Sequence, residues 1–125
     1  MVNSQSPELN LSGLDLAAFV QSEVSVTEKL YSILQKLNLA HNRIHLFKFD
    51  RLKDNLQFLD LSSNQLKSID GNIFPKNLKI LRLRDNRIET IPELPEGLEE
   101  FDISDNKLKI LPNYLILLEI FPSHL

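Results

Sequence analysis

The sequence predicts an α/β solenoid: a short curved right-handed arc with a parallel β-sheet on the concave face and mixed helical and extended returns on the convex face. Three observations predict it. One pattern of leucines occurs four times, it recurs at a nearly constant interval, and apolar residues alternate with other residues inside it. Self-similarity at an interval of about 20–50 residues indicates stacked repeats, and alternation with period two indicates a strand.

The pattern is L-x-x-L-x-L-x-x-N-x-L, and its copies begin at Leu34, Leu56, Leu78 and Leu98. Its asparagines, at intervals of 22, 22 and 20 residues, are Asn42, Asn64, Asn86 and Asn106. An asparagine amide both donates and accepts hydrogen bonds, so we expect these four to satisfy backbone groups of turns in their own and adjacent repeats. The alternating leucines are expected to share one interior, because no single repeat can bury its own apolar face.

We expect a single domain, since 125 residues suffice for one core. The expected repeats are 34–55, 56–77, 78–97 and 98–114. Residues 1–33 are expected to form an N-terminal cap and an irregular first repeat, and residues 115–125 a partial fifth repeat or a C-terminal cap.

The irregular first repeat is predicted from Leu11, Leu14 and Leu16, which fit the strand leucines of the pattern. In that alignment Phe19 takes the place of the asparagine, and the return that follows contains a predicted helix at 27–33.

The later returns differ from one another. Phe47 and Leu52 follow the first copy of the pattern, and Ile69 and Phe74 occupy the matching places after the second. We expect a short helical or 3₁₀ turn in these two returns. The third return, 91–97, contains two prolines, which lack backbone N–H donors, so we expect it to be extended.

Composition narrows the class of protein. The absence of cysteine excludes a disulfide framework, thiolate metal sites and a cysteine nucleophile. The first residues show no basic stretch followed by an apolar one, so we expect no secretory signal. The most apolar stretch of the tail, 114–121, is too short to span a membrane. We therefore expect a cytoplasmic, intracellular protein, in the host cell cytoplasm or nucleus if it is viral or effector-derived.

The net charge of −3 conceals an asymmetry. Residues 31–88 contain eleven basic and five acidic residues, whereas residues 89–125 contain two basic and eight acidic ones. Because sequence order is spatial order in a solenoid, we expect a positive middle and a negative C-terminal end. This distribution either steers a charged partner or is a solvated surface without a function.

Residues 34–112 resemble a leucine-rich repeat protein, on the strength of four consecutive copies of the pattern. The segment from Ile91 to Asn106 resembles the 20-residue repeats of bacterial effector proteins, whereas the 22-residue repeats look more like the intracellular class. The resemblance implies protein–protein recognition on the concave strand face, without catalysis or a cofactor.

We therefore expect a protein partner to bind the outward-facing strand positions. These are Lys36, Asn38, Phe58, Asp60, Ile80, Arg82, Arg84, Glu100 and Asp102. Phe58 and Ile80 are expected side by side, either as an apolar contact patch or as two scattered exposed residues. Asp60, Arg82 and Asp102 are expected to form a cross-strand Asp–Arg–Asp ladder that supports the register first and recognition second.

Two alternatives remain open at this stage. An exposed apolar strand at 118–121 would favour self-assembly, with a homodimer formed through the C-terminal edge. The basic middle repeats would favour nucleic-acid binding, although no aromatic residues are interleaved with them.

We predict that the chain is not an enzyme. His41, His45 and His124 are not accompanied by a nucleophile motif. Asp85 and Asp105 alone offer too few oxygen ligands for a hard cation, so we predict no metal site and no cofactor.

Overall fold

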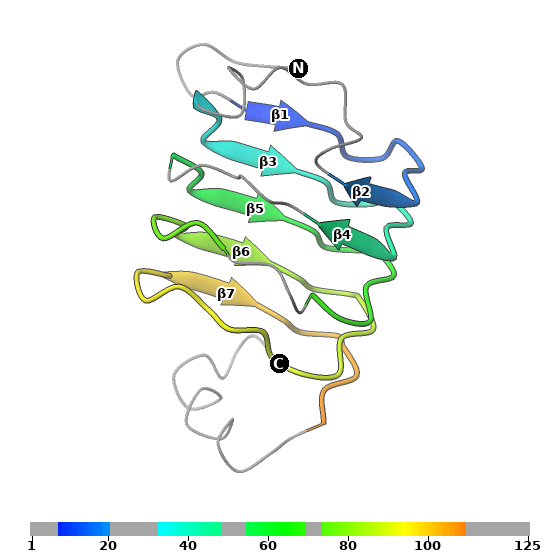
Figure 1. The fold of residues 1–125 in the computed structure, drawn as a ribbon. Helices are drawn as coiled ribbons and strands as arrows, with labels where there is room; N and C mark the ends of the chain where they lie inside the picture. Colours follow the sequence, from blue (N-terminus) through cyan, green and yellow to red (C-terminus); the bar gives the residue numbers. More distant parts are fainter. Residues whose placement is uncertain (1–7, 21–32, 49–54, 70–73, 110–125) are drawn as a thin grey trace.

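The computed structural model describes residues 8–20, 33–48, 55–69 and 74–109. Five strands stack side by side in one parallel sheet, in the order β1-β3-β5-β6-β7 (Figure 1). They are β1 (Glu8–Asn10), β3 (Lys36–Asn38), β5 (Phe58–Asp60), β6 (Ile80–Arg82) and β7 (Glu100–Asp102). The predicted parallel sheet of stacked repeats is confirmed.

The register aligns the central apolar residue of each strand with that of the next strand. Leu37 pairs with Leu59, Leu59 with Leu81, and Leu81 with Phe101. These side chains are at most 1% exposed, whereas their neighbours along β5, β6 and β7 are half-buried. Burying one such side chain stabilises the fold by about 1.5–3 kcal/mol, so the shared interior is the main source of stability.

The first repeat has a different register from the one that we expected. Leu9 lies beside Leu37, so the strand is Glu8–Asn10 and not the 11–16 segment. Leu14 takes the place of the repeat asparagine and is 55% exposed. The leucines at 11, 14 and 16 imitate the L-x-x-L-x-L spacing, whereas the actual strand has its buried leucine at Leu9.

Phe19 was expected at the asparagine place, and this was wrong: it lies in the return of the first repeat. There β2 (Ala18–Val20) pairs in parallel with β4 (Leu46–Lys48) and forms a second, two-stranded sheet (Figure 1). The rings of Phe19 and Phe47 stack with their centroids 5.5 Å apart and their planes at 25°. Both side chains are buried, so this pair extends the core beneath the returns.

The helical or 3₁₀ turns expected in the first two returns are not confirmed. The described part of the first return contains β4, and the described residues of the second, 67–69 and 74–77, contain no helix. Residues 91–95 contain no helix, and a turn follows in which the Leu98 N–H donates to the Pro95 carbonyl at 3.3 Å. The predicted helix at 27–33 lies outside the described residues apart from Ile33. The return at 49–54, the predicted fifth strand at 118–121 and the proposed dimer edge also lie outside them. In the described part of the chain, no helix is long and apolar enough to cross a membrane.

Each repeat asparagine ties its own repeat to the one before it. Asn64 is buried, and its Oδ1 accepts a hydrogen bond from the Ile44 N–H at 2.9 Å. Its Nδ2 donates to the carbonyls of Leu39 and Leu61 at 3.0 and 2.9 Å. Asn86 makes the corresponding bonds one repeat later. The asparagines therefore satisfy backbone groups that no strand pairing reaches.

The two outer asparagines show how the ladder begins and ends. Asn42 accepts from the N–H groups of both Leu14 and Leu16 at 2.9 Å, and it donates to the Leu11 carbonyl at 3.0 Å. Asn106 bonds back to repeat three in the same way. Because these bonds reach back to the preceding repeat, the first repeat needs no asparagine of its own, which accounts for Leu14.

A left-handed residue precedes each asparagine place. The φ angles are 57° at His41 and Ser63, 59° at Asp85, 56° at Asp105 and 67° at Gly13. This conformation turns the chain sharply after the strand. In the four repeats after the first, the asparagine side chain that follows points inward, whereas Leu14, which follows Gly13, is exposed. Only Gly13 adopts it without steric cost, so the other four turns are held by the bonds of the asparagine ladder.

Candidate functional site

The solvent-facing side of the five-stranded sheet, which we call the front face, consists of rows that run across the repeats. Row one is Glu8, Lys36, Phe58, Ile80 and Glu100, and row two is Asn10, Asn38, Asp60, Arg82 and Asp102. Row three is Ala40, Ser62, Arg84 and Ser104, and row four is His41, Ser63, Asp85 and Asp105.

All nine residues expected to bind a partner lie in these rows. Rows one and two also contain Glu8 and Asn10, which the sequence argument missed because it placed the first strand too late. An alignment of the first repeat that did not require the first leucine of the pattern would have placed Leu9 beside Leu37, and Glu8 and Asn10 on the outward side of the strand.

The centre of the front face is a contact cluster of Phe58, Ile80, Arg82 and Glu100. Phe58 and Ile80 are neighbours in row one, and both are half-buried. The guanidinium carbon of Arg82 lies 5.1 Å from the centroid of the Phe58 ring, and its terminal nitrogen lies 3.5 Å from a Glu100 carboxylate oxygen. Arg82 therefore covers part of Phe58, at a gain of about 0.5–1 kcal/mol for an exposed cation–π contact.

The expected Asp–Arg–Asp ladder has the predicted alignment but not the predicted pairing. Asp60, Arg82 and Asp102 are in register across three strands. In the described segments, however, Arg82 forms its ion pair with Glu100 and with neither aspartate.

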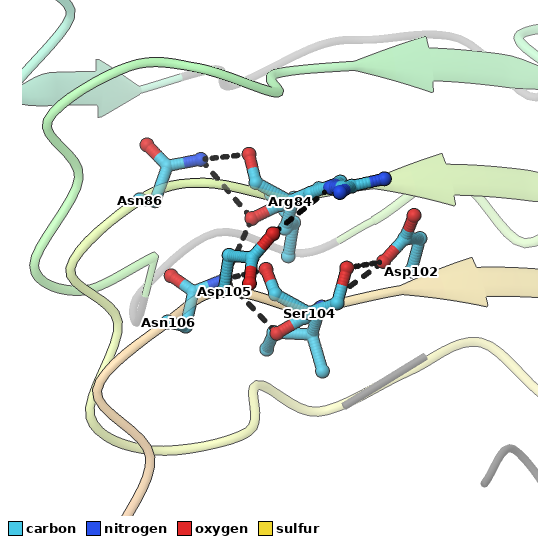
Figure 2. Close-up of polar contacts among 8 residues, drawn as sticks. Arg84, Asn86, Asp102, Ser104, Asp105 and Asn106 are labelled. Carbon is cyan, nitrogen blue, oxygen red and sulfur yellow. Dashed lines mark hydrogen bonds and ion pairs between the residues drawn. The ribbon is translucent and has the colours of Figure 1, made fainter. Parts of the chain in front are cut away.

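The aspartates instead bond to their own chain two residues ahead. Asp102 Oδ1 accepts from the N–H of Ser104 at 3.0 Å and from its hydroxyl at 2.6 Å (Figure 2). Asp60 Oδ1 accepts from the Ser62 N–H at 2.9 Å, and Asn38 makes the same bond to Ala40. These local turns prevail because such a bond orders only one side chain and two backbone residues.

The edge of the front face carries a second ion pair. Arg84 Nε lies 3.1 Å from an Asp105 carboxylate oxygen, and both side chains are mostly exposed (Figure 2). Among the described residues, Asp85 has no ion-pair partner. The four rows contain three cations and six carboxylates, a net charge of −3 with histidine neutral. The front face is therefore acidic as a whole. Four of its six carboxylates come from the two ends of the stack, on Glu8 and on residues 100–105, and only Asp60 and Asp85 lie in the basic segment 31–88.

A second surface, which we call the flank, follows the asparagines. One column is Asp15, Arg43, Gln65, Arg87 and Lys107, and the next is Ala17, His45, Lys67, Glu89 and Lys109. These columns contain five cations and two carboxylates, a net charge of +3 with histidine neutral. Positive and negative charge are thus separated between two faces of the described chain, in addition to the expected separation along the stack.

The flank contains the two groups whose pKa values are shifted. Lys109 Nζ lies 2.8 Å from a Glu89 carboxylate oxygen. The hydrogen bond from Lys109 and its charge lower the pKa of Glu89, and the nearby charge of Lys67 lowers it further. The same bond raises the pKa of Lys109. Both groups are exposed, so these shifts describe local charge and not a reactive centre.

The described residues offer little for chemistry. A hollow of about 580 Å³ in the segments that precede β6 and β7 is lined by Phe74, Leu94 and Pro95 with Lys76 and Glu96, and its lining includes no serine or histidine. No group of three or more histidine, aspartate and glutamate side chains able to hold a metal ion lies in the described segments.

Comparisons with known proteins bear on the family. A family model described as Leucine Rich repeats (2 copies) matches residues 54–96, and one described as Leucine Rich Repeat matches residues 97–118. A solved structure titled "Structure of Shigella effector LRR domain" is similar, with a TM-score of 0.51 and 23% identity over 84% of this chain. The match covers 52% of that structure, so this chain spans about half its length. No curated protein matches the chain.

Proposed function

This chain belongs to the leucine-rich repeat proteins, and from that premise we propose that it is a non-catalytic module that binds a protein partner on its front face. Leucine-rich repeat domains generally mediate protein–protein interaction. The front face is the side of the sheet that we expect to be concave. Catalysis, a metal and a cofactor form no part of the proposal.

The contact cluster is the observation that carries the proposal. It places an aromatic ring, an aliphatic side chain and an arginine together near the centre of the sheet face. Aromatic residues and arginine are enriched among the residues that dominate binding energy, and such residues lie near the centre of an interface. Acidic, amide and basic side chains surround this cluster, among them Lys36 beside Phe58, as expected for the polar rim of an interface.

The rigid support beneath the cluster also favours binding. Leu59 and Leu81, which lie between the outward residues of β5 and β6, are fully buried. The neighbouring strands are joined by hydrogen bonds such as Leu61 N–H to the Arg82 carbonyl at 2.8 Å. A preformed surface loses little conformational entropy on association, so more of the contact energy contributes to affinity.

Affinity capture tests the proposal. The tagged chain is used as bait in lysate of its native cell type, in parallel with the double variant Phe58→Ala/Arg82→Ala. Loss of two central contacts of about 1–2 kcal/mol each is expected to lower the affinity for the captured partner by about 30- to 1,000-fold.

A matched control removes charge from the other surface. Lys67→Ala/Arg87→Ala alters two exposed flank cations, and we expect it to retain the partner. Thermal unfolding of each variant shows whether the fold is intact. Capture that survives the front-face substitutions and fails with the flank substitutions would contradict the proposal.

A further inference from the structure

The charges of the front face are unequally matched. Across β5, β6, β7 and the turns that follow them, Arg82 is paired with Glu100 and Arg84 with Asp105. The remaining three carboxylates of these rows, on Asp60, Asp85 and Asp102, have no cationic partner among the described residues. On these three strands the positive charge is therefore neutralised within the face and the negative charge is available to a partner. Lys36, which lies beside Phe58 on the neighbouring strand β3, is the front-face cation outside these two pairs.

We propose that the front face selects a basic segment of its partner. In this arrangement an apolar side chain of the segment rests on Phe58 and Ile80, and lysine or arginine side chains reach Asp60 and Asp102. The inference rests on the proposed function and adds the chemistry of the partner to it.

The spacing of the front-face rows suits such a segment. Asp60 and Asp102 are two strands apart in row two, so about 10 Å separates their backbones. Phe58 and Ile80 lie two residues earlier on their strands, about 7 Å away. An extended segment repeats its side chains on one side at about the same 7 Å, so its apolar and basic residues meet the two rows together.

The carboxylates of Asp60 and Asp102 remain able to bind while they stabilise their turns. Each uses Oδ1 to accept the N–H two residues ahead. A carboxylate has about four acceptor positions, so Oδ2 is left for a cationic side chain.

The flank strengthens this selection. Its net charge of +3 repels a basic segment, whereas the front face attracts it. The flank would attract an acidic segment and the front face would repel it. To pair with Arg82 or Arg84, an acidic segment would have to displace Glu100 or Asp105. The two surfaces together direct a basic partner to one side of the molecule.

The test uses display libraries of random peptides with positive, zero and negative mean charge and equal apolar content, each selected against the wild-type chain. We expect enrichment from the positive library and weaker binding of its peptides at higher ionic strength. The front-face variant Phe58→Ala/Arg82→Ala then shows where the enriched peptides bind.

A charge-only variant is decisive. Asp60→Asn/Asp102→Asn removes two charges while keeping the turn bonds, because Asn38 already makes this bond with an amide. We expect it to lower the affinity for the positive peptides about 2- to 30-fold, since each exposed ion pair contributes about 0.2–1 kcal/mol. The matched control Lys67→Gln/Arg87→Gln, on the flank, should leave the affinity for these peptides unchanged or raise it.

The outcomes separate the two proposals. Enrichment of acidic or neutral peptides that depend on Phe58 and Arg82 overturns the basic partner and leaves front-face binding intact. Positive peptides that bind regardless of the front-face substitutions overturn both proposals. Two other results also overturn the proposal of a basic partner. One is an unchanged affinity of positive peptides for Asp60→Asn/Asp102→Asn, and the other is the absence of enrichment from every library.

Discussion

Replacing Asn86 with alanine tests the asparagine ladder at its most buried member. Asn86 is 5% exposed, and it accepts from the Leu66 N–H at 3.0 Å. It donates to the carbonyls of Leu61 and Leu83 at 3.0 and 3.1 Å and, at 3.3 Å, to the Arg84 carbonyl, which also accepts from the Ser63 N–H. The Leu61 carbonyl also accepts from Asn64, and the Leu83 carbonyl likewise has a second side-chain donor. The substitution therefore leaves only the Leu66 N–H without its partner, and each carbonyl retains one of two donors.

The expected cost follows from this count. A buried N–H without a partner costs about 1–3 kcal/mol, and the loss of one donor at each of the three carbonyls adds about 1 kcal/mol in total. We therefore expect Asn86→Ala to lower the free energy of unfolding by about 2–4 kcal/mol. That is a large part of the roughly 5–15 kcal/mol typical of a small domain.

Urea unfolding followed by circular dichroism measures the change. The control is Asn77→Ala, since Asn77 is exposed, and we expect it to alter stability by less than about 0.5 kcal/mol. A change in the free energy of unfolding of Asn86→Ala as small as that of the control would mean that the carbonyl and N–H groups find other partners. That result would refute the reasoning about the ladder.

Three further outcomes are expected. Asp60→Asn should have the same free energy of unfolding as the wild-type chain, whereas Asp60→Ala, which loses the turn bond, should have one about 1 kcal/mol lower. Equal urea midpoints for these two variants would contradict this. The carboxyl of Glu89 should titrate below its ordinary pKa by NMR, and its pKa should rise in Lys109→Gln, which removes the hydrogen bond and the nearer of the two charges. Because the folded pKa is depressed, the associated stabilisation is present above the unfolded pKa and is lost as pH falls through the folded one. Phe47→Ala should cost about 3–5 kcal/mol by urea unfolding, since it leaves a cavity against Phe19, and a loss below 1 kcal/mol would argue against their stacking.

The period of the leucines and asparagines was sufficient to predict the sheet. Leu37, Leu59 and Leu81 recur with one spacing and lie side by side in the core. Where the pattern weakens, spacing alone misled: Leu14 fits the strand pattern as well as Leu9 does, and only pairing with the next repeat decides between them. A terminal repeat has one neighbour, so its register is the least constrained by sequence.

The candidate site was predictable in position but not in contacts. The residues of rows one and two followed from alternation, because a strand directs every second side chain outward. The preference of Arg82 for Phe58 and Glu100 depends on side-chain conformations that spacing does not encode. The charge of the front face was also hidden, because front-face carboxylates such as Asp85 lie two residues from flank cations such as Arg87, so that their charges cancel in a count along the sequence.

The most direct measurement of the account is the set of scalar couplings across the hydrogen bonds that join the strands, observed by NMR. We predict couplings from the Leu39 amide to the Asp60 carbonyl, from Leu61 to Arg82, and from Leu83 to Asp102, for which the N–O distances are 2.7–2.8 Å. Their detection would establish the alignment that places Phe58, Ile80 and Arg82 on one face. Couplings to carbonyls displaced along the neighbouring strands, or none between these strands, would contradict the shared register and with it the front face.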